Sequence, residues 1–203
     1  MSSKRMAKKT KAAPSSAGQA RKSTKGKVAS QLVRKPMPRG AAAASSGTRT
    51  LPYDPQKGVI DLAGRVRSAS PLQLVQVERE GVRGRVLKDL APQMEIPASR
   101  FFRMMGVAKA TAERKAARNE MIAGTSGQAA IGMLKLLGMA QSIVENSTAP
   151  QAREFDTAKW LGQWIERPQP ALGGKRPAEL LDTPTGIDMV SRVLGAIESG
   201  AYL

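Results

Sequence analysis

Residues 155–203 read FDTAKWLGQWIERPQPALGGKRPAELLDTPTGIDMVSRVLGAIESGAYL, and this stretch decides the fold of the C-terminal part of the chain. Four of its apolar residues recur at helical spacing near the end, namely Ile187, Val190, Leu194 and Ile197. Apolar residues three and four positions apart lie on one face of a helix. The stretch therefore predicts a final amphipathic helix over about residues 185–198.

Aromatic residues gather at the start of the same stretch. Phe155, Trp160 and Trp164 are three of the seven aromatic residues of the chain. The two tryptophans are one helical turn apart, a spacing that more often indicates core packing than a binding surface. We therefore assign Trp164 to the core, and leave Trp160 open between a core position and an interface hot spot.

Two other parts of the stretch are candidates for contact with a partner protein. The loop ALGG contains Leu172, Gly173 and Gly174, and glycine there permits positive φ or the close approach of another chain. After the last predicted helix, Tyr202 and Leu203 with a terminal carboxylate form an apolar and anionic tip that can enter a partner's pocket. A frayed end is the alternative for this tip.

Residues 81–146 also have a helical pattern. A first helix is indicated around residues 86–94, and Pro97 suits the first turn of a second helix that ends at Gly106. A third helix is predicted from about Lys109 to Asn119. Three short helices with a three- to four-residue turn before the last predict a helix-turn-helix. A long buried helix follows, with Thr125 or Ser126 as its candidate N-cap.

The third helix carries the candidate DNA-binding residues. Its outer faces present hydrogen-bond donors at Lys109, Thr111, Arg114, Lys115 and Arg118. In a recognition helix the N-terminal residues meet base edges, and the flanking basic residues hold phosphates. A solvated basic face without a ligand is the alternative interpretation.

The first eighty residues give weaker indications of structure and function. Residues 51–80 are predicted to be a linker with an uncertain helix, because LQLVQV alternates like a strand whereas Ser70-Pro71 suits a helix start. Residues 1–49 contain thirteen Lys and Arg and no acidic residue, which predicts a disordered basic arm over residues 1–50. The arm either contacts DNA phosphates or is a solubilising tail, and Met37 offers an alternative start that removes most of it.

Composition argues against catalysis. The chain has no Cys and no His, and its sixteen carboxylates include no close pair framed by apolar residues. This excludes disulfides, thiolate nucleophiles, Cys/His metal sites and a histidine base. We therefore expect no catalytic, cofactor-binding or metal-binding residues. Because no apolar run is long enough to span a bilayer and no secretory signal is recognisable, we expect a cytoplasmic protein.

The C-terminal block resembles the toxin-binding domain of Xre/MbcA/ParS antitoxins. The family pattern appears in order as the elements Trp160-Leu161, Pro168, ALGG at 171–174 with Pro177, Glu179-Leu180-Leu181, Thr183 with Gly186, and Gly200-Ala201-Tyr202. The likeness extends over residues 81–203, since 81–146 resembles the Xre-type helix-turn-helix of this family. It departs from the family at GTSGQAA, where relatives carry a more charged segment, and it does not cover the first fifty residues.

This resemblance implies an all-α antitoxin with an Xre-like helix-turn-helix domain at 81–146 and a toxin-binding domain at 151–203. The implied partner is a RES-type toxin that consumes NAD or ADP-ribosylates a target, and the antitoxin would occlude its nucleotide cleft. Toxin-binding residues are then Trp160, Leu172, Gly173, Gly174, Tyr202 and Leu203. The N-terminal half would form a homodimer that binds promoter DNA and represses its own operon.

Two other functions are compatible with the sequence. The first is a stand-alone helix-turn-helix regulator whose C-terminal block only oligomerises, and the second is a nucleoid-type architectural protein that uses the basic arm. A neighbouring reading frame for a small RES-type protein favours the antitoxin, and its absence favours the regulator. Deletion of residues 1–49 should abolish DNA binding by an architectural protein and leave operator preference to a repressor.

Overall fold

The computed structural model describes residues 51–198. The predicted arm and the predicted tip at Tyr202 and Leu203 lie outside these residues. The chain divides into two units, Met1–Ala44 and Ser45–Leu203, and the described residues belong to the second. They are all-α, as predicted, apart from two short strands. The elements are α1 Gly58–Ser68, α2 Pro71–Glu80, β1 Val82–Arg83, α3 Gly84–Gln93, α4 Ala98–Met104, α5 Lys109–Ala117, β2 Met121–Ile122, α6 Gly124–Glu145, η1 Pro150–Glu154, α7 Thr157–Trp164, η2 Pro170–Leu172, η3 Pro177–Glu179 and α8 Pro184–Glu198.

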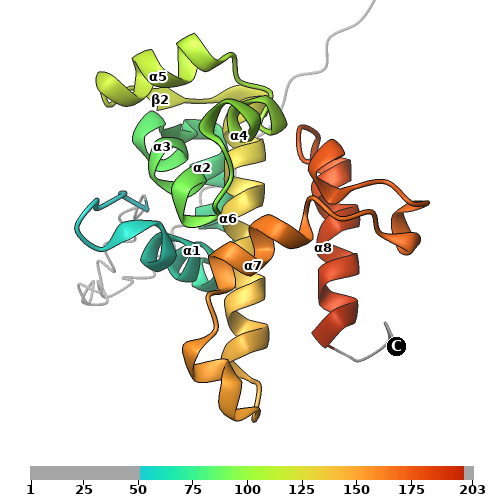
Figure 1. The fold of residues 1–203 in the computed structure, drawn as a ribbon. Coiled ribbons are helices and arrows are strands. Elements are labelled where there is room, and N and C mark those ends of the chain that lie inside the picture. Colours follow the sequence, from blue (N-terminus) through green and yellow to red (C-terminus); the bar gives the residue numbers. More distant parts are fainter. Residues whose placement is uncertain (1–50, 199–203) are drawn as a thin grey trace, which may run out of the picture. The chain divides into compact units, whose positions relative to one another are not determined.

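The long helix α6 is the centre of the fold. It runs through the described part of the chain, with α1, α7 and α8 packed around it (Figure 1). Its residues Ile131, Met133, Leu136 and Leu137 are fully buried, so the predicted central buried helix is confirmed. Helices on opposite sides of α6 therefore share one hydrophobic core, which reaches from Val59 to Leu194.

The predicted N-cap of α6 is wrong. The helix begins at Gly124, and its N-cap residue is Ala123, which provides no side-chain hydrogen bond. Ser126 lies inside the helix instead, and its hydroxyl donates to the carbonyl of Gly106 at 3.0 Å. This hydrogen bond joins the first turn of α6 to the turn between α4 and α5, a long-range partner that local sequence did not indicate.

Residues 51–80, for which we expected a linker with an uncertain helix, form two helices that pack into the core. Helix α1 buries Val59, Leu62, Ala63 and Val66. Helix α2 starts with a reciprocal capping box, because the Ser70 hydroxyl accepts from the backbone of Gln73 and the Gln73 side chain accepts from the backbone of Ser70. The Ser-Pro start therefore indicated the helix correctly, and the alternation of LQLVQV did not produce a strand.

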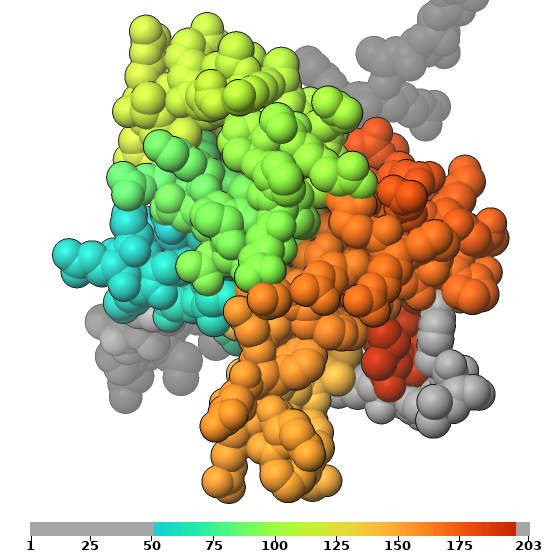
Figure 2. All heavy atoms as spheres, viewed as in Figure 1, coloured from blue at the N-terminus to red at the C-terminus, as the bar shows by residue number. Residues whose placement is uncertain are grey.

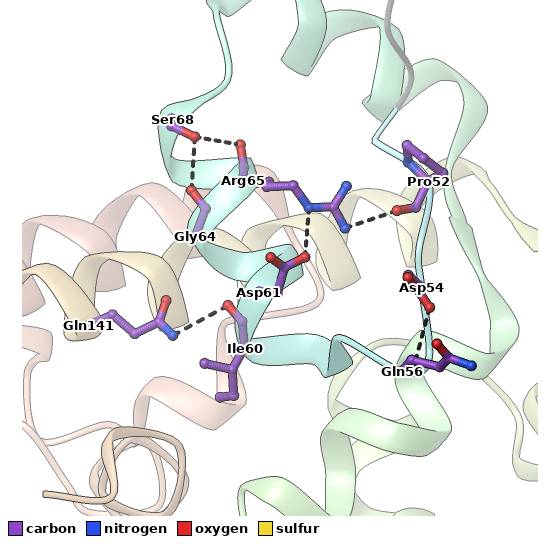
Figure 3. Close-up of polar contacts among 9 residues, drawn as sticks. All are labelled: Pro52, Asp54, Gln56, Ile60, Asp61, Gly64, Arg65, Ser68 and Gln141. Carbon is purple, nitrogen blue, oxygen red and sulfur yellow. Dashed lines mark hydrogen bonds and ion pairs between the residues drawn. The ribbon is translucent and has the colours of Figure 1, made fainter.

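Polar contacts hold the start of the described chain against α1. The guanidinium of Arg65 donates to Asp61 on the same helix and to the carbonyl of Pro52, both at 2.9 Å (Figure 3). The hydroxyl of Tyr53 donates to Asp89 on α3 at 2.6 Å. Burial, followed by this hydrogen bond, raises the pKa of Tyr53, so its phenol stays protonated as the donor.

Helices α3, α4 and α5 occupy the positions predicted for the three short helices. Gly106 lies in the turn after α4 with φ 65°, as its predicted role at a helix end requires. The strands β1 and β2, which we did not predict, pair antiparallel with Val82 opposite Ile122. Because β1 precedes α3 and β2 follows α5, this ladder fastens the two ends of the three-helix unit, residues 82–122, to each other.

The elements that follow α6 pack against it through α7 and α8. Leu161 and Ile165 of the α7 region and Leu181, Val190 and Leu194 of the α8 region are fully buried. The final helix begins at Pro184 and ends at Glu198, close to the predicted bounds. Within residues 51–198 none of the helices is both long enough and apolar enough to span a bilayer.

Candidate functional site

The loop between η2 and η3 is closed by its own backbone. The carbonyl of Gln169 accepts the N–H groups of Leu172 at 2.9 Å and Gly174 at 3.0 Å, and its N–H donates to the carbonyl of Lys175 at 3.0 Å. Gln169 is the one polar side chain fully buried among the described residues, with 6% exposed. A loop tied at both ends in this way keeps its shape before a partner arrives, which lowers the entropy lost on binding.

The predicted loop residues have different positions. Leu172 is 7% exposed, so it anchors the loop to the core and presents little surface to a partner. Gly173 and Gly174 are exposed and have φ values of 65° and 78°. A Cβ added at either glycine would meet nothing within 4 Å, so the loop needs glycine for its backbone conformation and not for close packing. The two glycines face open space and are available for contact.

A ladder of three aromatic rings runs along the start of the same block. Trp164 is 7% exposed, as its predicted core position requires, and Trp160 is half-buried. Their ring centroids are 6.1 Å apart at an interplanar angle of 19°. The ring of Phe155 lies beside that of Trp160, with a centroid distance of 6.0 Å and an interplanar angle of 54°. Phe155 was not among the predicted contact residues, although it belongs to the aromatic cluster of the sequence.

Helix α7 is joined to the corner between α3 and α4. The ammonium of Lys159 pairs with Glu95 at 2.9 Å, and the guanidinium of Arg100 forms a two-pronged ion pair with Glu166. These hydrogen bonds, more than the accompanying charge attraction, raise the pKa values of Lys159 and Arg100. Figure 2 shows the corresponding surfaces of the three-helix unit and of residues 150–180 in contact.

The contact between α7 and the corner after α3, which we term the joint, contains an unusual backbone conformation. Glu95 has φ 53°, a left-handed value that is uncommon for a residue with a side chain. The turn brings the backbone of Met94 so close to α7 that only glycine fits at position 162. None of these contacts joins neighbours in sequence, and they were not predicted.

Thr183 and Gly186, which belong to the family pattern, form the N-terminal cap of α8. The hydroxyl oxygen of Thr183 accepts from the N–H of Gly186 at 3.1 Å, which is the N-cap hydrogen bond of α8. A Cβ at Gly186 would lie 1.9 Å from the carbonyl oxygen of Leu180. These two residues therefore fix the start of α8.

Three of the five predicted DNA-binding side chains on α5 have partners within the described residues. Lys109 pairs with Glu113 at 3.8 Å, and Arg118 pairs with Glu120 at 3.7 Å. Both pairs are exposed, so they can exchange their partner for a phosphate at little cost. The ammonium of Lys115 donates to the carbonyl of Met121 on β2 at 2.7 Å.

Lys115 thus holds β2 against α5, as Arg83 does from β1 by donating to the carbonyl of Asn119 at 2.9 Å. Thr111 is half-buried and Arg114 is exposed. Among the described residues, the side chain of Arg114 has no ion pair or hydrogen bond. Of the predicted set, Arg114 is therefore the cation most readily available to an external anion.

Charge is unevenly distributed between the two parts. Residues 81–123 contain nine basic and four acidic residues, whereas residues 124–198 contain seven basic and eight acidic residues. The positive surplus therefore lies on the three-helix unit and not on the C-terminal block. Among the described residues, no group of three acidic side chains is arranged to hold a metal ion.

Comparison of the sequence with known proteins identifies the family to which the chain belongs. Residues 153–200 match the model of the Xre/MbcA/ParS antitoxin C-terminal toxin-binding domain. The chain is 35% identical over 134 residues to the Prs ADP-ribosylating antitoxin of Sphingobium sp. (strain YBL2), an alignment that covers 66% of this chain and 83% of that relative. The chain belongs to the Xre/MbcA/ParS antitoxin family. The resemblance inferred from the sequence is confirmed.

Membership of the Xre/MbcA/ParS family gives α7, the glycine loop and α8 a common role. These elements lie in the matched toxin-binding domain, so the protein is an antitoxin whose C-terminal block is built to bind a toxin. Family and relative are both antitoxins, which makes the chain a binding protein and not an enzyme.

Proposed function

We propose that this antitoxin neutralises a RES-type toxin that consumes NAD or ADP-ribosylates a target, by covering the toxin's nucleotide cleft. The observation that carries the proposal is the exposed, internally closed loop at Gly173 and Gly174 within the toxin-binding domain. The name of the Sphingobium relative, Prs ADP-ribosylating antitoxin, refers to the same chemistry. Trp160 and the tip at Tyr202 and Leu203 complete the proposed contact.

The test is co-expression of the antitoxin with the protein encoded by the neighbouring reading frame. Growth should be arrested by that protein alone and rescued by the full-length antitoxin. A chain truncated before Phe155 is not a suitable negative control in this assay. The truncation removes Leu161, Ile165 and Val190 from the core and exposes the face of α6 that they cover, so loss of rescue could reflect misfolding. A neighbouring protein that is harmless, or whose toxicity is unaffected by the antitoxin, contradicts the proposal.

A point substitution at the loop tests the proposed contact without disturbing the core. Ala171 is exposed beside the two glycines, so Ala171→Arg should obstruct a toxin while leaving the free antitoxin folded. We expect the dissociation constant for the toxin to rise at least about tenfold, as for a central interface residue. Isothermal titration measures it.

The matched control is Gln56→Arg, which introduces the same side chain at an exposed position before α1. It should leave toxin affinity unchanged, and both variants should melt at the temperature of the wild type. Equal toxin affinity of Ala171→Arg and the wild type would remove the loop from the interface.

The C-terminal tip gives a separate prediction. We expect removal of Tyr202 and Leu203 to weaken neutralisation in the co-expression assay and to leave DNA binding unchanged, because the tip is proposed to enter the toxin cleft. Growth rescue titrated against inducer concentration measures the first effect, and a mobility-shift assay measures the second. Full rescue by the shortened chain would mean that the tip is only a chain end.

We also propose that α3, α4 and α5 act as a helix-turn-helix, with α5 as recognition helix, and that a homodimer represses its own promoter. The observation that favours this second function is the positive surplus of residues 81–123. A stand-alone regulator remains the alternative, and it predicts promoter binding without a toxin partner. Retention of a promoter fragment by the purified chain tests DNA binding itself.

A further inference from the structure

The aromatic ladder ends at an exposed ring. Phe155 is 41% exposed and precedes α7 by two positions, while the innermost ring of the ladder, Trp164, is buried. Phe155 therefore does not move as a free surface side chain, since its ring lies against Trp160 and Trp160 stacks on Trp164. A ring that is held before binding loses little conformational entropy when a partner covers it.

Two charged groups close to Phe155 in sequence, those of Asp156 and Lys159, have partners among the described residues, whereas Arg153 and Glu154 are exposed. The carboxylate of Asp156 accepts from the backbone N–H of Lys159 at 2.9 Å as the N-cap of α7. The ammonium of Lys159 pairs with Glu95 at 2.9 Å. If another protein covers the ring of Phe155, Asp156 and Lys159 therefore keep their partners. Burying a charged group without a partner would cost free energy. The chemistry of this surface suits an apolar patch on another protein.

We infer that Phe155 and the exposed part of Trp160, which we term the aromatic edge, form a second docking point for the toxin. The inference rests on the proposed function, because the toxin is the occupant. The aromatic edge lies in the segment matched as the toxin-binding domain, which favours a toxin over a second copy of the chain. Phenylalanine and tryptophan are also among the residues enriched in the buried centre of protein interfaces.

Helix α7 lies between Phe155 and the glycine loop along the chain. This helix has eight residues and a length of about 12 Å. The ion pairs Lys159–Glu95 and Arg100–Glu166 hold the α7 region against the corner between α3 and α4. The aromatic edge is therefore carried by a fixed element, and it is tested separately from the glycine loop.

The first test uses the full chain and the toxin from the co-expression experiment. Phe155→Ala should raise the dissociation constant at least about tenfold. Ile60→Ala is the matched control, because Ile60 is a large hydrophobic residue with a similar exposed fraction, 39%, and lies on α1, outside the segment matched as the toxin-binding domain. Ile60→Ala should leave toxin affinity unchanged. Phe155→Tyr should retain the wild-type affinity.

A second readout does not depend on any substitution at Phe155. The chain contains two tryptophans, so labelling with 5-fluorotryptophan gives two ¹⁹F resonances, which Trp160→Phe assigns. Addition of unlabelled toxin should shift the Trp160 resonance and change that of the buried Trp164 much less. An unshifted Trp160 resonance at saturating toxin overturns the aromatic edge as a contact.

The outcomes separate this inference from the proposed function. If the toxin binds the wild type and Phe155→Ala equally, the aromatic edge is not an anchor and the proposed function stands. If the toxin does not bind the wild type at all, the proposed function fails and the aromatic edge fails with it. Circular dichroism melting shows whether Phe155→Ala is folded, and an unfolded variant leaves the ¹⁹F result to decide.

Discussion

We expect Gly162→Ala to lower the free energy of unfolding by about 3 kcal/mol, the upper part of the range for inserting a methyl group into a packed site. The added Cβ would lie 2.0 Å from the carbonyl oxygen of Met94 and 3.0 Å from its carbonyl carbon. Both atoms are backbone, so no side chain can turn away to make room. Helix α7 or the corner after α3 must move instead.

Neither of these elements moves freely. The side chain of Met94 is buried, and its N–H donates to the carbonyl of Leu90 at 3.1 Å. On the other side, α7 is held by the ion pair between Lys159 and Glu95 and by that between Arg100 and Glu166. A shift that relieves the clash therefore disturbs the joint as a whole, including the helix that carries Trp160.

Urea unfolding followed by circular dichroism measures the effect. Gly64→Ala is the control, because Gly64 also lies within a helix, α1, and a Cβ there would meet nothing within 4 Å. Alanine is the better helix former, so this control should raise the free energy of unfolding by about 0.5–1 kcal/mol. If both variants lost a similar amount of unfolding free energy, the effect would come from replacing any helical glycine and not from the contact with Met94.

The helices could be predicted from the sequence where their apolar pattern was long or their ends carried strong signals. The repeat of apolar residues identified α8, and Pro97 and Gly106 bounded α4. The role of residues 51–80 was not predictable in the same way. Helix α1 is a core element because it lies against α6, almost eighty residues later, and no local signal reports that pairing.

The ladder of β1 and β2 was missed for a related reason. Each strand has two residues, too few for an alternating pattern. The N-cap of α6 was predicted from the preference of serine for that position, but Ser126 donates to Gly106 from inside the helix. Preferences of single residues are weaker than the tertiary partners that a fold provides.

For the candidate site, the sequence indicated the segment that the toxin-binding-domain model matches, but not which of its side chains are exposed. Leu172 and Gly173 are neighbours in one loop, yet the first is buried and the second is exposed. Lys115 was predicted as a DNA contact, and in the structure its ammonium donates to the carbonyl of Met121, a partner that the sequence did not indicate. Which side chains point outward, and which are already engaged, depends on contacts between segments. Composition and spacing do not contain that information.

Arg114 is the residue of α5 whose substitution should weaken DNA binding most. We expect Arg114→Glu to lower affinity for the promoter fragment about a hundredfold, since it removes a contact worth about 1–3 kcal/mol and adds repulsion of the phosphates. Lys115→Gln should instead lower the free energy of unfolding by about 1 kcal/mol through loss of the bond to Met121. Mobility shift and urea unfolding are measured on both variants.

Arg192→Glu makes the same charge change on α8, away from the basic three-helix unit, and should affect DNA affinity much less. The residues 1–49 add thirteen positive charges that can bind any DNA, so each variant is also compared without them. In a repressor, the effect of Arg114→Glu on promoter preference survives this deletion, and the salt dependence becomes shallower. If the deletion abolishes DNA binding and Arg114→Glu has no effect, the basic arm and not α5 contacts DNA, as an architectural protein requires.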